Sequence, residues 1–193
     1  NTAAFELFIC ALSGIQSDLI VSEYVMNYAD RKLYRLIPIS IEDLKEYNAK
    51  KFDIDSNDCR KIFDIHSMTY KTSLLKDLGL NLQEGISYTD TEFCYFPFRF
   101  VESIVFCRNM VYEYSLDLPN QTVSVSSRIK SLNAMSLIAF RILDDFKTLS
   151  LTENSIVCDN CRIFSRSVVE YYYQTVLLYC KKNEVLNKNL KSF

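Results

Sequence analysis

The strongest candidate for chemistry in this sequence is the carboxylate of Asp90, which lies in the segment Tyr88-Thr-Asp-Thr-Glu92. Thr89 and Glu92 have the spacing of a capping box, which predicts Thr89 as a helix N-cap and Asp90 as the first helical residue. A carboxylate there meets free backbone N–H groups and the positive end of the helix dipole, which favour its ionised form and fix its direction. Asp90 is therefore a candidate functional carboxylate. The alternative is that it only stabilises the start of the helix.

A second acidic segment resembles a calcium-binding loop but does not complete it. Asp53, Asp55, Asn57 and Asp64 occupy positions 1, 3, 5 and 12 of such a loop. Asp58 stands where the loop needs glycine, and position 12 is normally glutamate. We interpret the segment as a solvated acidic turn that caps a helix.

Cysteine, histidine and tyrosine give weaker signals. Cys158 and Cys161 form a C-x-x-C motif, but the chain has no second cysteine pair and a single histidine, so a closed zinc site lacks ligands and we expect buried or idle thiols. His66 has no accompanying hydrolase serine motif or P-loop, which excludes those classes and favours a structural hydrogen-bonding role. On a helix, the run Tyr171-Tyr-Tyr173 points in three directions, which predicts core and interface positions.

The composition is that of an ordinary globular protein. The chain has 193 residues, 49% of them hydrophobic, with 22 basic and 24 acidic residues and three glycines. A net charge of −2 provides no basic field for nucleic acid, and no apolar run is long enough to cross a membrane. Seven cysteines without a disulfide pattern fit a reducing compartment, so we expect a cytoplasmic protein.

The pattern of apolar residues predicts mixed helices and strands, followed by helices alone. We expect helices over residues 3–16 and 41–47, one within 68–78 and one over 89–100. We also expect paired strands over 19–26 and 33–39, and a hairpin of 103–107 with 110–114. Gly14 and Gly79 are placed to end the first and third of these helices. The tail predicts long helices over 127–149 and 163–182, with Ser150 and Glu153 at capping-box spacing.

The segment 63–93 resembles part of the family-2 glycosyltransferases, specifically the bacterial polysaccharide-building kind. In that family a Tyr-Arg/Lys helix precedes a glycine-containing turn and then an acidic-Asp-x-x-Phe/Tyr motif, which Tyr70-Lys71 and Thr89-Asp-Thr-Glu-Phe93 resemble. Val111-Tyr-Glu-Tyr114 and Asn120-Gln-Thr-Val-Ser124 are similar to its Tyr-x-Tyr strand and Gln-Ser-Val-Ser segment. The stretch from Phe5 to Tyr24 resembles the helix and strand that follow its metal-binding D-x-D. The resemblance covers residues 3–126 in collinear order.

This resemblance implies the fold and the site. The fold would be α+β, a partial A-type glycosyltransferase domain over residues 1–126 with a helical appendage over 127–193. The parent enzyme would transfer a sugar from a nucleotide donor to a hydroxyl group of a glycan or lipid-linked acceptor, with inversion. Asp90 would be the catalytic base, and His66, Tyr70 and Lys71 would line or support the acceptor side. Thr89 departs from the family pattern, which has an acidic residue there.

The resemblance also implies that the nucleotide-binding half lies outside this chain, which begins at Asn1 without methionine. We therefore expect neither cofactor-binding nor metal-binding residues here, while Mg²⁺ or Mn²⁺ would act in the full-length parent. Asp53-Ile-Asp55 follows the strand that the D-x-D should precede, so it is not that motif. The isolated chain is expected to be inactive and to form homo-oligomers, because its strands would otherwise join the absent half. The protein would be cytoplasmic and could lie peripherally at the inner surface of the membrane. The alternative is a non-catalytic helical module that binds a partner.

Overall fold

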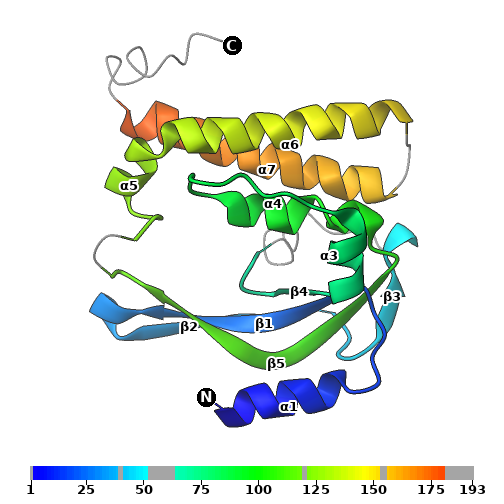
Figure 1. Cartoon of the computed structure of the whole chain (residues 1–193). Coiled ribbons are helices and arrows are strands. Elements are labelled where there is room, and N and C mark those ends of the chain that lie inside the picture. Colours follow the sequence, from blue (N-terminus) through cyan, green and yellow to red (C-terminus); the bar gives the residue numbers. More distant parts are fainter. Residues whose placement is uncertain (1, 39–40, 52–63, 119–120, 153–155, 181–193) are drawn as a thin grey trace.

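The computed structural model of the chain has a mixed sheet with helices on both faces, so the expected α+β class is confirmed (Figure 1). The structure describes residues 2–38, 41–51, 64–118, 121–152 and 156–180. Two long helices, α6 (Leu132–Thr152) and α7 (Ile156–Tyr179), cover one face of the sheet, while α1 (Thr2–Leu12) lies against the other. Among the described residues, none of the helices combines the length and apolar character that a membrane crossing requires.

The central pair of the sheet is β1 (Leu19–Tyr28) and β5 (Ser103–Leu116), which run parallel. On its other side β1 pairs antiparallel with β4 (Met68–Tyr70) near its start and with β2 (Leu33–Ile37) near its end. The last strand, β3 (Glu46–Asn48), pairs antiparallel with β5. The predicted pairing of the first two strands is therefore confirmed, except that residues 39 and 40 lie outside the described residues.

The predicted hairpin within residues 103–114 is wrong, because these residues belong to one long strand. β5 pairs with β1 both before and after a register shift, from Ser22 opposite Cys107 to Tyr24 opposite Tyr112. The extra residues are polar in part, which gave the sequence its turn-like character, but they form an irregularity inside the strand. After the shift, Tyr112 and Tyr114 lie on the face of the sheet that carries the cavity described below.

The main core lies between the sheet and the C-terminal helices. Leu19 of β1 and Phe106 of β5 belong to the same buried cluster as Ile138 of α6 and Phe164 of α7. On the opposite face a smaller cluster joins Phe8 of α1 to the sheet. Apolar side chains alternate between these two faces along the strands, as period-two patterning requires. The helices α6 and α7 therefore share a core with the sheet.

Several predicted helices start or end elsewhere. Residues 41–47 are not helical, since they lead into β3. The helix predicted within 68–78 is confirmed as α3 (Thr72–Leu78), which follows the strand β4 at residues 68–70. Gly79 ends α3 in the left-handed conformation, with its N–H donated to the Lys76 carbonyl, as predicted. The helix predicted over 89–100 is α4 (Thr89–Tyr95) followed by the short 3-10 turn η3 (Phe98–Phe100). Two further 3-10 turns are η1 (Ala29–Arg31) and η2 (Ala49–Lys51).

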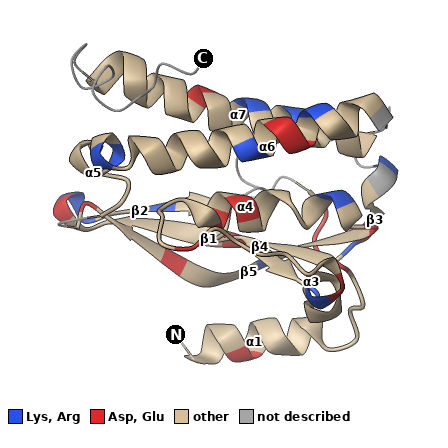
Figure 2. Ribbon diagram, turned by 45° about the horizontal axis from the view of Figure 1, so that its top comes forward, with Lys and Arg blue, Asp and Glu red and all other residues tan. Residues whose placement is uncertain are grey.

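The C-terminal helices have other boundaries than predicted. The first is interrupted at Ser131, which separates α5 (Val125–Lys130) from α6, and α7 begins seven residues before Ile163. Ser150 lies inside α6, so it is not an N-cap, and Glu153 lies outside the described residues. Acidic and basic residues both occur along α6 and α7 (Figure 2). Some of them form exposed pairs within a turn, such as Arg162 with Asp159 and Lys147 with Asp144.

Candidate functional site

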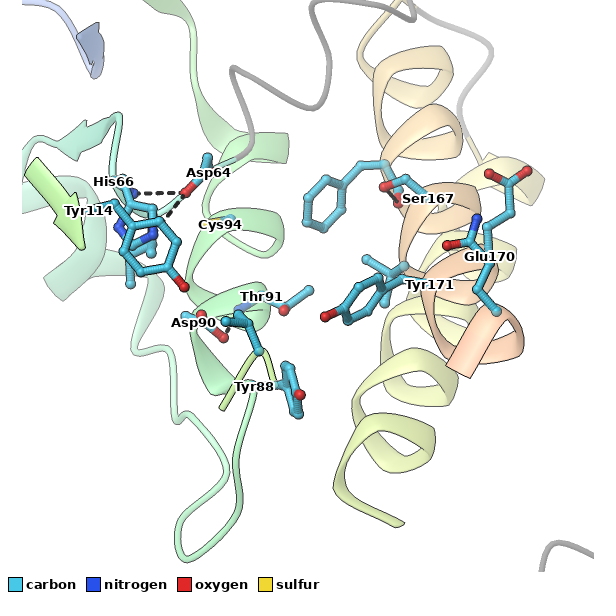
Figure 3. A pocket seen from close by; sticks show the side chains of 15 residues that line it. Asp64, His66, Tyr88, Asp90, Thr91, Cys94, Tyr114, Ser167, Glu170 and Tyr171 are labelled. Atoms are coloured by element: carbon cyan, nitrogen blue, oxygen red, sulfur yellow. Dashed lines mark hydrogen bonds and ion pairs between the residues drawn. The ribbon is translucent and has the colours of Figure 1, made fainter. Parts of the chain in front are cut away.

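A cavity of about 370 Å³ lies between α4 and α7. Its polar wall on the sheet side comes from the residues before β4, the start of α4 and the end of β5, and α7 forms the facing wall (Figure 3). The polar and aromatic side chains that line the cavity include those of Asp64, His66, Tyr88, Asp90, Tyr114 and Tyr171. The cavity therefore joins segments from the middle of the chain to α7.

Asp90 is exposed to the cavity from the first turn of α4. Its Oδ1 accepts a hydrogen bond of 3.0 Å from the Thr91 N–H. The predicted capping box is wrong: Thr89 is already helical, and Tyr88 occupies the N-cap position without a side-chain cap. Tyr88 has a φ of 71°, a strained left-handed conformation for a residue with a side chain. Its hydroxyl donates to the Thr122 carbonyl at 2.9 Å, which ties the start of α4 to the segment before α5.

Glu92 anchors α4 instead of capping it. Its side chain is fully buried, and Oε1 accepts a hydrogen bond of 2.6 Å from Arg141 of α6. Oε2 accepts from the Gln83 N–H at 2.9 Å, and Arg141 also donates to the Asn81 carbonyl at 3.2 Å. A buried carboxylate needs such partners, since an unpaired charge in the interior is very costly. The pair therefore holds α4, α6 and the segment before α4 together.

Asp64 connects β1 to the residues before β4. Its Oδ2 accepts a hydrogen bond of 2.7 Å from the Tyr24 hydroxyl, and Oδ1 accepts from the backbone N–H of His66 at 3.1 Å. The imidazole Nε2 of His66 lies 3.7 Å from the same Oδ1. The sequence singled out Asp64 only as the last position of an incomplete calcium loop, and the other residues of that loop lie outside the described residues.

His66 lies among three tyrosine rings. The imidazole stacks on Tyr112 with ring centres 4.6 Å apart, and its centre is 4.0 Å from that of Tyr114 and 5.4 Å from that of Tyr24. Burial lowers the pKa of His66, while the negative charges of Asp64 and Asp90 act in the opposite direction. The imidazole is therefore neutral at pH 7, and a change of charge in the cavity would alter its pKa.

The negative charge of Asp90 acts on the tyrosines of both walls. Burial raises the pKa of Tyr88 to about 12, and it also raises the pKa values of Tyr114 and Tyr171. Asp90 adds to each of these increases. All three hydroxyls are therefore protonated at neutral pH. The Tyr88 hydroxyl already donates to the Thr122 carbonyl, whereas those of Tyr114 and Tyr171 can donate hydrogen bonds to a ligand. The charge of Asp90 therefore acts on tyrosines of both walls.

The wall from α7 contains a residue whose role sequence reasoning missed. Of the three consecutive tyrosines, Tyr172 is buried in the core, Tyr173 is exposed, and Tyr171 lines the cavity opposite Tyr88, with ring centres 6.4 Å apart. Their three directions were predicted from helix geometry, but the sequence carried no sign that α7 faces α4. Glu170 also lines the cavity, and its Oε1 accepts a 2.7 Å hydrogen bond from Arg166.

Two of the four residues that the sequence singled out line the cavity, Asp90 and His66. Tyr70 is buried beneath α4, where its hydroxyl donates to the Cys94 carbonyl at 2.8 Å, so it supports the helix from below. Lys71 lies away from the cavity, with its Nζ 3.8 Å from Oδ1 of Asp18. Cys158 and Cys161 are buried in the core. In the part of the chain that the structure describes, no three His, Cys, Asp or Glu side chains are arranged to hold a metal ion.

Comparison with known proteins adds no relatives: no protein-family model matches the chain, and no curated protein matches it with significant similarity.

Proposed function

We propose that this chain is the acceptor-side part of an inverting glycosyltransferase of polysaccharide or glycoconjugate synthesis, with Asp90 as its general base. One observation carries the proposal: the Asp90 carboxylate lines the cavity with Oδ1 held by the Thr91 N–H. Among the described residues, no hydrogen-bond donor is assigned to Oδ2. That oxygen is therefore free to accept the proton of a ligand hydroxyl, which is the task of a general base.

The walls of the cavity suit a sugar ring. Tyr88 and Tyr171 meet at an angle of 63°, and Tyr114 lies on the sheet side. Each ring offers a flat apolar face and a hydroxyl at its edge. A pyranose has the matching distribution, with apolar C–H groups on its faces and hydroxyl groups around its rim. A cavity with aromatic walls and a few placed polar groups is also the usual form of a small-ligand site.

The proposed reaction conserves charge and atoms with Asp90 as the proton acceptor. The acceptor O–H bond breaks as Asp90 takes the proton, and the oxygen forms a new bond to the anomeric carbon of the donor. The bond from that carbon to the nucleotide diphosphate breaks on the opposite face, and the diphosphate leaves with the electron pair. A positioned base typically contributes a factor of about 10²–10⁴ to such a step.

The donor and its cation belong to another part of the proposed enzyme. Mg²⁺ or Mn²⁺ would neutralise the diphosphate, and following the family resemblance we assign the donor and the cation to the nucleotide-binding half of the full-length parent. The proposed partners are a nucleotide sugar and a glycan or lipid-linked acceptor. The proposed location is the cytoplasm, at the inner membrane surface where the acceptor is lipid-linked.

The test replaces Asp90 by asparagine in the full-length gene product. Asp90→Asn keeps the size of the side chain but cannot accept the proton, so turnover should fall about a hundredfold or more. The free energy of unfolding should change by at most about 1 kcal/mol, because the interaction with the helix dipole is small at an exposed site. Asp77→Asn, at an exposed position of α3, is the matched control and should transfer sugar normally. Near-normal turnover of Asp90→Asn would contradict the proposal.

The alternative function is a non-catalytic module that binds a partner through its helices. One observation favours it: Leu177 and Leu178 near the end of α7 are 77% and 69% exposed. Under this alternative, Asp90→Asn would retain full function, while Leu177→Glu and Leu178→Glu would abolish partner binding. Under the glycosyltransferase proposal, Asp90→Asn should abolish most of the sugar transfer, while Leu177→Glu and Leu178→Glu should leave it nearly unchanged.

A further inference from the structure

Arg128 of α5 is half-buried behind Tyr171, a residue of the cavity wall, and does not itself line the cavity. It has no acidic partner among the described residues. Its guanidinium carbon lies 4.2 Å from the ring centre of Tyr171 and 5.3 Å from that of Tyr179. The Nε donates to the Thr175 hydroxyl at 3.1 Å, and Nη2 donates to the same oxygen. That hydroxyl is a neutral acceptor and donates its own proton to the Tyr171 carbonyl at 3.0 Å.

Arg128 differs in this respect from the other half-buried arginines that the structure describes. Arg99 pairs with Asp145 at 2.7 Å, and Arg141 pairs with Glu92 at 2.6 Å. A guanidinium has five N–H donors, and those of Arg128 that are not on Thr175 have no protein acceptor within the described ranges. Partial burial of a cation is unfavourable unless a counter-charge compensates it. The arrangement fits a site whose counter-charge arrives with a ligand.

The charge of Arg128 acts on the same wall as the charge of Asp90. Tyr171 lies under the guanidinium and also lines the cavity, where it meets Tyr88. Burial raises the pKa values of both tyrosines, and Arg128 opposes the increase while Asp90 adds to it. The Tyr88–Tyr171 wall is therefore placed between the exposed carboxylate of Asp90 and a cation for which the described part of the chain offers no counter-charge.

We propose that Arg128 binds the anionic group of the acceptor, a carboxylate or a phosphate ester, while Asp90 faces the acceptor hydroxyl. This proposal rests on the proposed function, because it names the chemical class of the substrate for the same site. The planar guanidinium fork matches both anions with two parallel hydrogen bonds, and stacking on tyrosine preorganises it. The acceptor is accordingly an acidic sugar or a sugar carrying a phosphate.

Binding of simple sugars to the 193-residue chain tests the anion preference. Calorimetry at low salt compares glucuronic acid, glucose 1-phosphate and glucose, and the first two separate the carboxylate source from the phosphate source. At least one anionic sugar should bind at least tenfold more tightly than glucose, and half-molar salt should remove most of the difference. Equal binding of all three sugars, or binding of none, would overturn the proposal. Tighter binding of UDP than of either anionic sugar would assign Arg128 to the donor diphosphate and would also overturn it.

Variants at two positions of α5 identify the cation responsible. Arg128→Gln should abolish the anion preference, and Arg128→Lys should retain only part of it because lysine lacks the planar fork. Lys130→Gln removes the same charge from an exposed position of the same helix and should bind as the wild type does. Far-ultraviolet circular dichroism of each variant checks that it is folded. An anion preference that survives in folded Arg128→Gln contradicts the proposal.

The two proposals can fail separately. If the anion preference depends on Arg128 but Asp90→Asn transfers sugar normally, the anion site stands and the proposed function is wrong. If Asp90→Asn is inactive and the full-length enzyme uses neutral and anionic acceptors equally, with and without Arg128, the function stands and the anion site is wrong.

Discussion

His66 reports on the charges of the cavity at the scale of a single residue. It is the only histidine of the chain, so its imidazole gives a unique proton resonance. Burial among tyrosine rings lowers its pKa, against the opposing charges of Asp64 and Asp90. We expect an NMR titration to give a pKa below the ordinary value of about 6.5. Asp90→Asn removes one opposing charge and should lower the pKa of His66 further, whereas Asp77→Asn should not change it.

The lowered pKa of His66 has a defined effect on stability. Above about pH 6.5 the imidazole is neutral in both the folded and the unfolded chain, so its contribution is constant. As the pH falls below that value the unfolded chain binds a proton first, and the free energy of unfolding decreases until the folded pKa is passed. Urea unfolding at closely spaced pH values should show this decrease, and His66→Phe should lack it. An increase in stability over the same interval would contradict the assigned direction.

At the residue scale, the sequence predicted Asp90 and His66 as site residues because their neighbours in sequence form motifs. It could not predict Asp64, since the partner that orients it, Tyr24, lies 40 residues away. No feature of the sequence indicated a role for Arg128, because that role depends on which of the described residues surround it in space. Tyr70 and Lys71 were predicted together from one motif, yet Tyr70 is bonded beneath α4 and Lys71 lies beside Asp18, away from the cavity.

At the scale of elements, α4 depends on the buried pair of Glu92 and Arg141. Glu92 has no exposed surface, while 35% of the Arg141 side chain is exposed. Arg141→Gln leaves a buried carboxylate with the Gln83 N–H as its remaining donor, so we expect a loss of roughly 2–3 kcal/mol. The double variant Glu92→Gln/Arg141→Gln should lose less than the sum of the single losses, with a coupling of about 1 kcal/mol or more.

Urea unfolding measures these losses, and an exposed pair provides the control. Arg162 and Asp159 are 61% and 55% exposed, so Arg162→Gln should cost no more than about 0.5 kcal/mol. Additive losses at Glu92 and Arg141 would mean that the two side chains stabilise the fold independently, which would contradict the assigned role of the pair in positioning α4.

The elements that sequence predicted well are those whose own pattern decides their structure. The strand β1 and the termination of α3 at Gly79 follow from local periodicity and the left-handed preference of glycine. The start of α4 was misplaced because Glu92 bonds Arg141, which is 49 residues away, instead of completing a capping box. The hairpin predicted within β5 was wrong because these residues pair with the parallel strand β1 on both sides of a register shift. No local feature of the sequence specifies that pairing.

At the scale of the whole molecule, the sequence predicted a division between residues 1–126 and a helical tail, yet α7 of this tail forms one wall of the cavity. The shared core of the sheet, α6 and α7 gathers residues that are far apart in the chain, since Leu19 and Phe164 belong to the same buried cluster. The sequence shows that the sheet and these helices have apolar faces, but it does not show which faces pack against one another. The two parts should therefore unfold in a single transition by both circular dichroism and tyrosine fluorescence.

The expected self-association of the chain can be assigned to β2. This strand pairs only with β1 among the described residues, and its Tyr34 and Leu36 are 64% and 44% exposed on one face. An apolar strand at the edge of a sheet offers unpaired backbone groups to a second copy, and charged residues there oppose such pairing. We expect a dimer at tens of micromolar by light scattering, and a shift towards monomer in Tyr34→Lys and Leu36→Lys.

Leu151→Lys, at an 87% exposed position of α6, controls for a general effect of surface charge and should leave the dimer intact. A monomeric wild-type chain would show that β2 is protected without a partner, and equal loss of the dimer in Leu151→Lys would place the contact elsewhere.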